Sequence, residues 1–273
     1  MSMPSAPETA RAFTSTKLFE GLARGGYAAR GVIYVLIGIL ALRLARGVGT
    51  EKASQQGALR TIAHQSFGRT LLVAMAIGLA GYALWRLAQA LVGETPEAGK
   101  HDAKDRVAAV GSGIAYAAFC VIAISVLRGK SGGNSSSSSR KATADALGWT
   151  GGRELVGLVG LVIIGIGAYQ IYQGVAKRFL EDSKTGEMTA EVRRAFTYLG
   201  VAGHVARGVA FVLIGIFAIK AAIDYKPREA VGLDGALYRL TQHTYGSVAL
   251  LVVALGLIAF GAYSLADARF RKI

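Results

Sequence analysis

Six long apolar blocks, separated by polar segments, dominate the pattern of this chain. Each block is close to the roughly 20 helical residues that are needed to cross a bilayer. The pattern therefore predicts an all-α integral membrane protein with six transmembrane helices. The predicted spans are residues 25–45, 70–93, 107–127, 155–176, 201–222 and 247–268.

Residues 1–24 form a polar amino-terminal arm without the apolar core and small-residue cleavage site of a signal peptide. We expect the first span to act as the insertion signal, and six spans place both termini on one side of the membrane. Lysine and arginine residues divide equally between the two sides, so the positive-inside rule gives no answer. We expect cytoplasmic termini, because a basic arm without a signal peptide is rarely exported.

The first and fifth spans share a sequence motif. GYAARGVIY at residues 26–34 recurs as GHVARGVAF at 203–211, and the similarity continues into the span that follows each motif. A weaker middle copy places GIAY at 113–116 opposite GVIY at 31–34. The repeats therefore predict one membrane domain of three helical hairpins, at residues 25–93, 107–176 and 198–268.

Each hairpin contains two spans, so the three repeats cross the membrane in the same sense and are related by an axis along the membrane normal. We expect a six-helix bundle with pseudo-threefold symmetry; a linear array of hairpins would produce the same repeats. The middle hairpin differs in its connection, which carries SGGNSSSSS at residues 131–139. This low-complexity stretch predicts a flexible loop rather than a site.

These motifs carry a family resemblance. GYxxRG at 26–31, its echo at 203–208, FGR at 67–69 and the threefold helix pair resemble the bacterial membrane family known as domain of unknown function 1206. The resemblance runs from about residue 22 to the end of the chain. It implies a multi-pass protein of the bacterial cytoplasmic (inner) membrane, and no catalytic residue comes with it. Ser112 stands where the other repeats have Arg30 and Arg207, which argues against a strictly threefold arginine site.

Composition narrows the range of functions. The chain is 52% hydrophobic and 18% charged, unlike a disordered protein or an ordinary soluble enzyme. We assign its net charge of +14 to loops that meet anionic lipid headgroups, not to nucleic-acid binding. The single cysteine, Cys120, excludes an intramolecular disulfide and a cysteine-based metal site. No motif predicts a metal, a cofactor or a catalytic set, so we do not expect an enzyme.

Polar residues inside the spans predict the functional site. With a helical rise of about 1.5 Å per residue, Arg30 and Arg207 lie roughly 8–10 Å inside the boundary on the side of the termini. The second helix of each repeat returns to this depth, where aromatic and polar residues four apart share one face. The predicted ligand-binding residues are Arg30, Arg86, Arg207, Gln89, Gln173, Asp267, Trp85, Tyr169 and Tyr263.

Three arginines and one carboxylate, Asp267, in a low-dielectric layer predict a site for an anion. The arginines would bind the negative group of a lipid headgroup, a small metabolite or an ion in passage. Gln89, Gln173 and Asp267 would orient or gate it, and the aromatic residues would line the site. The apolar outer halves of the spans argue against an open pore, which leaves a small transport or ligand-binding protein.

A structural interpretation competes with this one. The arginines can reach the headgroups with their charged ends, or Arg86 and Arg207 can pair with Asp267 and lock the helices together. The protein would then be a structural or accessory membrane subunit. A protein partner or a homo-oligomer is compatible with both interpretations.

Overall fold

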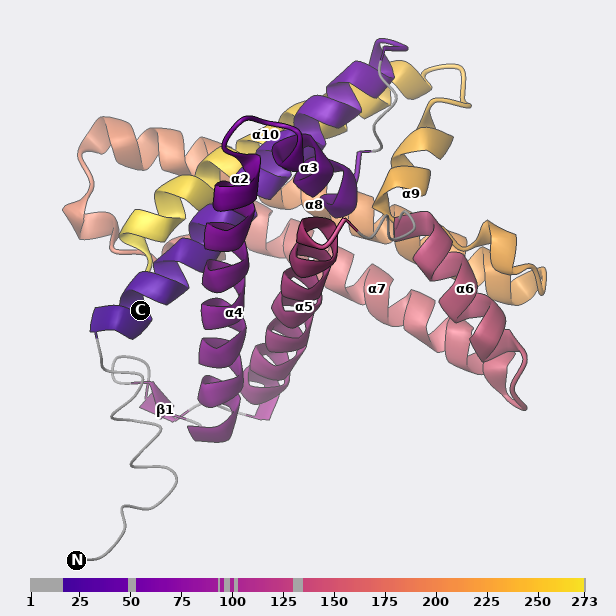
Figure 1. The fold of residues 1–273 in the computed structure, drawn as a ribbon, viewed down its shortest axis with the longest axis horizontal. Helices are drawn as coiled ribbons and strands as arrows, with labels where there is room; N and C mark the ends of the chain where they lie inside the picture. Colours follow the sequence, from indigo (N-terminus) through magenta and orange to yellow (C-terminus); the bar gives the residue numbers. More distant parts are fainter. Residues whose placement is uncertain are drawn as a thin grey trace, which may run out of the picture.

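A computed structural model describes residues 17–48, 53–92, 94–95, 99–100, 103–129 and 135–272. Within this part, six helices are long and apolar enough to cross a membrane (Figure 1). The prediction of an all-α, multi-pass membrane protein is therefore confirmed. The long helices are α2 (Lys17–Ala45), α4 (Gly68–Val92), α5 (Ala103–Leu127), α7 (Gly152–Val175), α8 (Ala190–Ile223) and α10 (Gly246–Phe270).

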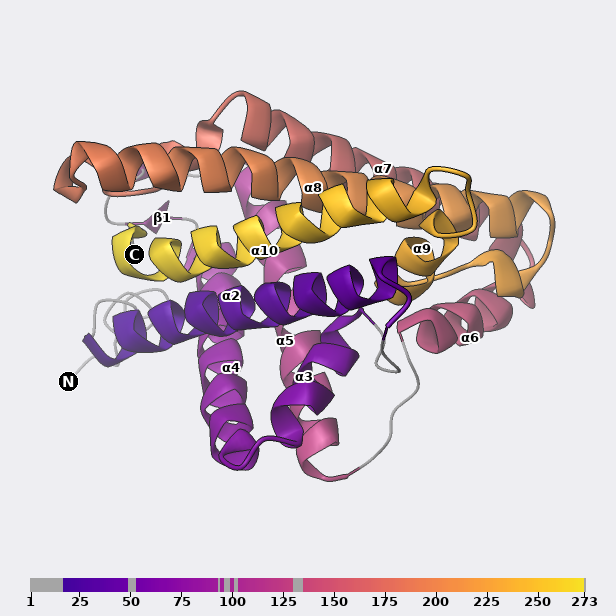
Figure 2. The same cartoon turned by 90° about the horizontal axis from the view of Figure 1, so that it is seen from above.

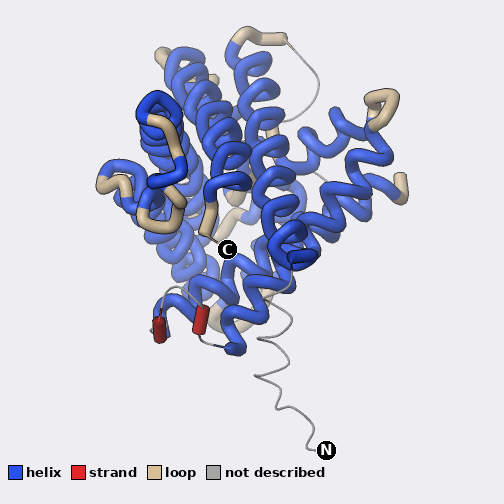
Figure 3. The backbone as a smooth tube through the Cα atoms, turned by 90° about the vertical axis from the view of Figure 1, so that its left-hand side faces the viewer, coloured by secondary structure: helices blue, strands red, loops and turns tan. Residues whose placement is uncertain are grey.

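A shorter helix connects the two long helices of each repeat. These helices are α3 (Gln55–Ala63), α6 (Ser135–Leu147) and α9 (Leu233–Leu240). Single 3-10 turns lie at Arg178–Leu180, Thr185–Glu187 and Pro227–Glu229. Between α4 and α5, strands β1 (Glu94–Thr95) and β2 (Gly99–Lys100) form a two-residue antiparallel pair, drawn in red in Figure 3.

Two long helices begin well before their predicted apolar blocks. The first turn of α8 is stabilised by the Thr189 hydroxyl, which accepts a hydrogen bond from the Val192 N–H at 3.3 Å. At the start of α2, Glu20 and Arg24 form an ion pair at 2.7 Å. Arg24 also donates to the Ala268 carbonyl at 2.8 Å. The beginning of α2 therefore lies beside the end of α10, as an even number of spans requires (Figure 2).

The six long helices form an interrupted ring. Their order is α2, α4, α5, α7, α8, α10 and back to α2, which is the order expected for three hairpins around one axis. In the described part of the chain, five of these six neighbouring pairs pack extensively, and α5 with α7 is the exception. Figure 1 shows α4 and α5 steeply inclined to α7 and α8. We refer to the unpacked pair as the α5–α7 opening.

Small residues at the same repeat position form the three junctions between repeats. A Cβ added to Gly208 would lie 2.6 Å from the Gly167 carbonyl oxygen, so only glycine permits this approach of α8 to α7. Cys120 occupies the position of Gly38 and Gly215, and its thiol donates to the Ala76 carbonyl at 3.4 Å. The junctions are therefore three copies of one interface. The corresponding pairs at these junctions are Gly31 with Gly261, Gly208 with Gly167 and Gly113 with Ala83.

The junctions inside the first and third repeats also correspond to each other. In the first repeat, Gly26 of α2 lies against Gly78 and Tyr82 of α4. In the third, Gly203 of α8 lies against Phe260 of α10. A glycine on the first helix thus receives an aromatic side chain from the second helix in both repeats.

The middle repeat lacks the residues that make this junction. Val162 and Ile166 of α7 occupy the corresponding positions, and they are 54% and 46% exposed. A Cβ added to Gly111 of α5 would meet no atom within 4 Å. Branched side chains have replaced the small residue and the aromatic ring, which explains the α5–α7 opening. The counterparts are Gly78 and Gly256 for Val162, and Tyr82 and Phe260 for Ile166.

The serine-rich stretch is folded over part of its length. Residues 131–134 lie outside the described residues, but α6 begins at Ser135. The Asp234 carboxylate accepts hydrogen bonds from the hydroxyls of Ser135 and Ser136, the latter at 2.8 Å. It also accepts one from the Ser136 N–H at 3.0 Å. The prediction of a flexible loop is therefore wrong for Ser135–Ser139, because Asp234 of α9 gives the first hydroxyls a fixed partner.

Ser136 also caps a helix of the next repeat. In the first repeat, the Ser54 hydroxyl accepts from the Gly57 N–H at 3.1 Å and caps α3. The third repeat has Gly232 at the position of Ser54. There the Ser136 hydroxyl accepts from the Gly235 N–H at 3.1 Å and supplies the missing cap to α9.

Removing this cap is expected to loosen the start of α9. Ser136→Ala leaves the Gly235 N–H without its acceptor and removes one of three hydrogen bonds to the Asp234 carboxylate, at a cost of about 1–2 kcal/mol. Amide hydrogen exchange in the first turn of α9 should accelerate by about 5- to 30-fold. Ser138→Ala, in the exposed part of the same turn, is the control. Equal exchange rates in the two variants would contradict the capping role.

Candidate functional site

A buried carboxylate, Asp267, lies at the centre of the predicted polar layer. Its side chain has no exposed surface, with a relative accessibility of 0%. One oxygen, Oδ2, lies 3.6 Å from a guanidinium nitrogen of Arg30 and 3.6 Å from one of Arg271. The other, Oδ1, accepts a hydrogen bond from the Ser183 hydroxyl at 3.2 Å. A single carboxylate thus faces two arginines.

Arg271 belongs to this cluster although it lies beyond the last predicted span, which ends at residue 268, and was not among the predicted site residues. It follows Asp267 by four residues, the helical spacing that could have revealed it. Its guanidinium also pairs with Asp182 at 2.9 Å. Burial by itself would lower the pKa of Arg271, but the Tyr27 hydroxyl and the two carboxylates hold it well above its ordinary value. Arg271 therefore carries a permanent positive charge.

Arg86 ends a chain of hydrogen bonds between α4 and α2. Its Nε donates to the Tyr82 hydroxyl at 2.9 Å, and this hydroxyl donates to that of Tyr27 at 3.1 Å. The guanidinium also lies 5.0 Å from the ring centroid of Trp85. Trp85 is buried, as is the predicted Tyr263. These polar contacts join helices in the manner of the structural interpretation.

Arg30 and Arg207 both lie over the Phe260 ring, at 5.4 and 4.9 Å from its centroid. Arg30 also lies 4.7 Å from the Tyr27 ring centroid. Each Nε atom is buried and has no hydrogen-bond partner among the described residues. Arg30 still has Asp267, whereas no carboxylate of the described part lies within 4.0 Å of the Arg207 guanidinium. Arg207 therefore differs from the other arginines of the layer.

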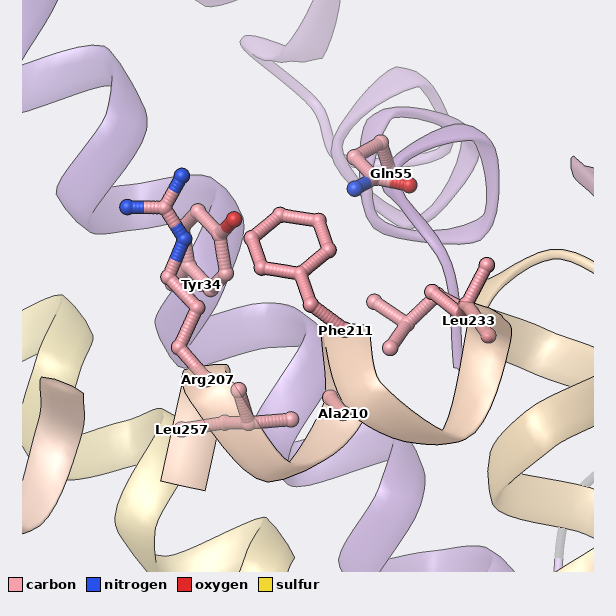
Figure 4. Close-up of a pocket in the computed structure, with 8 residues that line it drawn as sticks. Tyr34, Gln55, Arg207, Ala210, Phe211, Leu233 and Leu257 are labelled. Atoms are coloured by element: carbon pink, nitrogen blue, oxygen red, sulfur yellow. The ribbon is translucent and has the colours of Figure 1, made fainter. Parts of the chain in front are cut away.

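A small cavity lies beside Arg207 (Figure 4). Tyr34 lies next to the guanidinium, and Phe211 lies between Arg207 and Gln55. The empty space there is about 270 Å³ when the part open to solvent is included. The enclosed part is small, with room for a few water molecules at most. Its lining residues are Tyr34, Gln55, Arg207, Ala210, Phe211, Ile214, Leu233 and Leu257.

Tyr116 of α5 is a further residue that the site prediction missed. It occupies the repeat position of Tyr34 and Phe211, so the alignment of 113–116 with 31–34 could have found it. It is only 6% exposed, and its buried hydroxyl has no hydrogen-bond partner among the described residues. This hydroxyl interacts electrostatically with both Arg30 and Arg207. Tyr116 thus adds an unused hydrogen-bonding group to the interior of the ring.

Two predicted residues lie away from this interior. Tyr169 of α7 is 59% exposed, and its hydroxyl accepts a hydrogen bond from the Gln173 amide at 2.6 Å. We correct the prediction that Tyr169 lines the site, and Gln173, which was predicted to orient or gate the ligand, bonds to Tyr169 instead. The helix turns Gly160 and Gly167 toward α8, and the α5–α7 opening leaves the face of Tyr169 without a partner. The side chain of Gln89 lies outside the described residues.

The comparisons with known proteins follow the same threefold pattern. The family model "Domain of Unknown Function (DUF1206)" matches three stretches of the chain, residues 25–93, 107–177 and 202–271. The chain belongs to the DUF1206 family. Each match covers one helical hairpin, so the predicted family and its triplicated unit are confirmed.

A relative in this comparison comes from Bacillus subtilis (strain 168). The protein YxxB, described as uncharacterized, is 33% identical over 243 residues, which cover 89% of this chain and 87% of the relative. No solved structure matches the chain. Among the described residues, no group of three histidine, cysteine, aspartate or glutamate side chains could hold a metal ion.

Proposed function

We propose that this DUF1206 protein is a ligand-binding membrane protein that holds an anionic group against Arg207 and Arg30 inside the helix ring. The observation that carries the proposal is the unmatched charge of Arg207. Its Nε is buried without an acceptor, and no described carboxylate lies within ion-pair distance. A small cavity, partly open to solvent, lies beside it on the side of Tyr34 and Phe211.

The balance of charge in the layer supports this proposal. Among the described residues, three arginines, Arg30, Arg207 and Arg271, lie in the cluster with two carboxylates, Asp182 and Asp267. A charge without a partner is costly in a low-dielectric interior. A phosphate or carboxylate would bind the planar guanidinium through two parallel hydrogen bonds and offset that cost.

The two interpretations of the polar layer apply to different parts of it. The contacts of Arg30 and Arg271 with Asp267, and the chain from Arg86 to Tyr27, join the helices and favour a locking role. The Arg207 guanidinium has no such partner in the described part of the chain, which favours binding there. We propose the bacterial cytoplasmic membrane as the location, with cytoplasmic termini and no catalytic activity. We propose binding rather than transport as the main function, because the cavity beside Arg207 is small.

Native mass spectrometry of the gently extracted protein tests the binding role. We expect the wild-type protein to retain an anionic adduct, and Arg207→Gln to reduce its occupancy at least about tenfold, a loss of roughly 1.4 kcal/mol or more. Arg194→Gln is the matched control, because Arg194 lies on the same helix but is exposed. A wild-type protein without an adduct, or an adduct that survives Arg207→Gln at full occupancy, would overturn the proposal.

A further inference from the structure

We infer that the anionic ligand is a membrane amphiphile whose headgroup contacts Arg207 and whose acyl chain lies against Val162 and Ile166 in the α5–α7 opening. This inference rests on the proposed function and names the class of its ligand. It also gives a function to the α5–α7 opening, where the ring of helices is interrupted in the described part of the chain.

The opening follows from specific replacements in the middle repeat. Where the other repeats pack Gly78 and Gly256 against the first helix, α7 carries Val162, which is exposed. Ile166 is exposed in the same way, and a Cβ on Gly111 of α5 would meet nothing within 4 Å. These groups leave apolar surface on both helices, and hydrocarbon is the chemistry that matches such a surface in a bilayer.

A buried polar group on α5 points to the headgroup. Tyr116 is on α5, one of the two helices that border the opening, and its hydroxyl is buried without a partner among the described residues. It interacts electrostatically with Arg30 and Arg207. An anionic oxygen there would accept from the hydroxyl and from a guanidinium. The apolar surface at the opening and the cationic interior therefore follow one another in the same order as the tail and the headgroup of a lipid. The tail would lie outside the ring of helices and the headgroup inside it.

Charge and access together distinguish this ligand from a dissolved ion. Val162 and Ile166 of α7 at the opening are aliphatic, and a bare phosphate would have to lose its hydration to pass them. A lipid anion reaches the arginines laterally from the leaflet with its tail still in hydrocarbon. A zwitterionic lipid carries a cationic group that the excess of arginines would repel.

The test blocks the opening without touching the arginines. Val162→Trp fills the proposed path of the acyl chain, and the smaller Val162→Phe serves if the first variant is poorly folded. Leu161→Trp is the matched control, because Leu161 and its counterparts Ile77 and Leu255 are all exposed to lipid. The delipidated proteins are titrated with dioleoyl phosphatidylglycerol, dioleoyl phosphatidylcholine or inorganic phosphate, and bound species are counted by native mass spectrometry.

We expect phosphatidylglycerol to bind the wild-type protein and Leu161→Trp equally, and Val162→Trp at least tenfold more weakly. Phosphatidylcholine should bind all three more weakly than phosphatidylglycerol binds the wild type. Equal phosphatidylglycerol binding by both tryptophan variants would overturn the inference. Phosphate binding that depends on Arg207, while phosphatidylglycerol fails to bind, would overturn it and leave the anion site standing. If Arg207→Gln changes no binding at all, the proposed function itself fails.

Discussion

Replacing Asp267 with asparagine is expected to lower the free energy of unfolding by about 3–5 kcal/mol. The carboxylate is fully buried and lies 3.6 Å from both Arg30 and Arg271. Asparagine keeps the size of the side chain but removes its charge, so Arg30 loses its ion-pair partner inside the protein. The loss is large because a buried cation without a partner keeps its desolvation penalty and loses its Coulomb attraction.

The measurement is equilibrium denaturation in mixed micelles. Asp182→Asn is the matched control, because it removes a carboxylate from the same Arg271 at a site that is 56% exposed. Exposed ion pairs contribute about 0–1 kcal/mol, so this variant should remain close to the wild type. Combining Asp267→Asn with Arg30→Met should cost less than the sum of the two single changes. A cost for Asp267→Asn no greater than that of Asp182→Asn would contradict a locking role.

Gly167→Ala is expected to destabilise the protein by about 1–3 kcal/mol, the usual cost of overpacking a tight contact. Its new Cβ would lie 2.7 Å from the Gly208 carbonyl oxygen and 2.8 Å from the Val212 side chain. The carbonyl belongs to the backbone of α8, so relief requires a movement of the whole helix. The junction between the second and third repeats would therefore widen.

Gly165→Ala provides the control on the same helix. Nothing lies within 4 Å of a Cβ at Gly165, so this variant should gain about 0.5–1 kcal/mol from the lower flexibility of alanine. The two variants carry the same glycine-to-alanine change on opposite sides of α7, so they differ only in what the new methyl group meets. Denaturation curves that shift in the same direction by the same amount would show that α7 and α8 do not approach as closely as described.

Much of the architecture was determined by the sequence. The lengths of the apolar blocks predicted six spans, and the repetition of residues 26–34 at 203–211 predicted parallel hairpins. The repetition was equally compatible with a linear array of hairpins, and the packing of α10 against α2 in the structure decided for a ring. Arg30, Arg86 and Asp267 were placed in one layer by counting helical rise, and the structure brings them into the same cluster through Tyr27 and Tyr82.

Which face of each helix points inward was decided only by the tertiary structure. The face of Tyr169 and Gln173 matches that of Trp85, yet it lies outside because Val162 and Ile166 prevent closure of the middle repeat.

Pairings between distant segments were likewise visible only after folding. Ser183 bonds to Asp267, and Ser136 of one repeat caps α9 of the next. The physical reason is that lipid and protein interior are equally apolar, so hydrophobic periodicity in a membrane helix does not mark its buried face. The sequence determined which residues share a face, and the fit of small and large side chains between helices determined what that face meets.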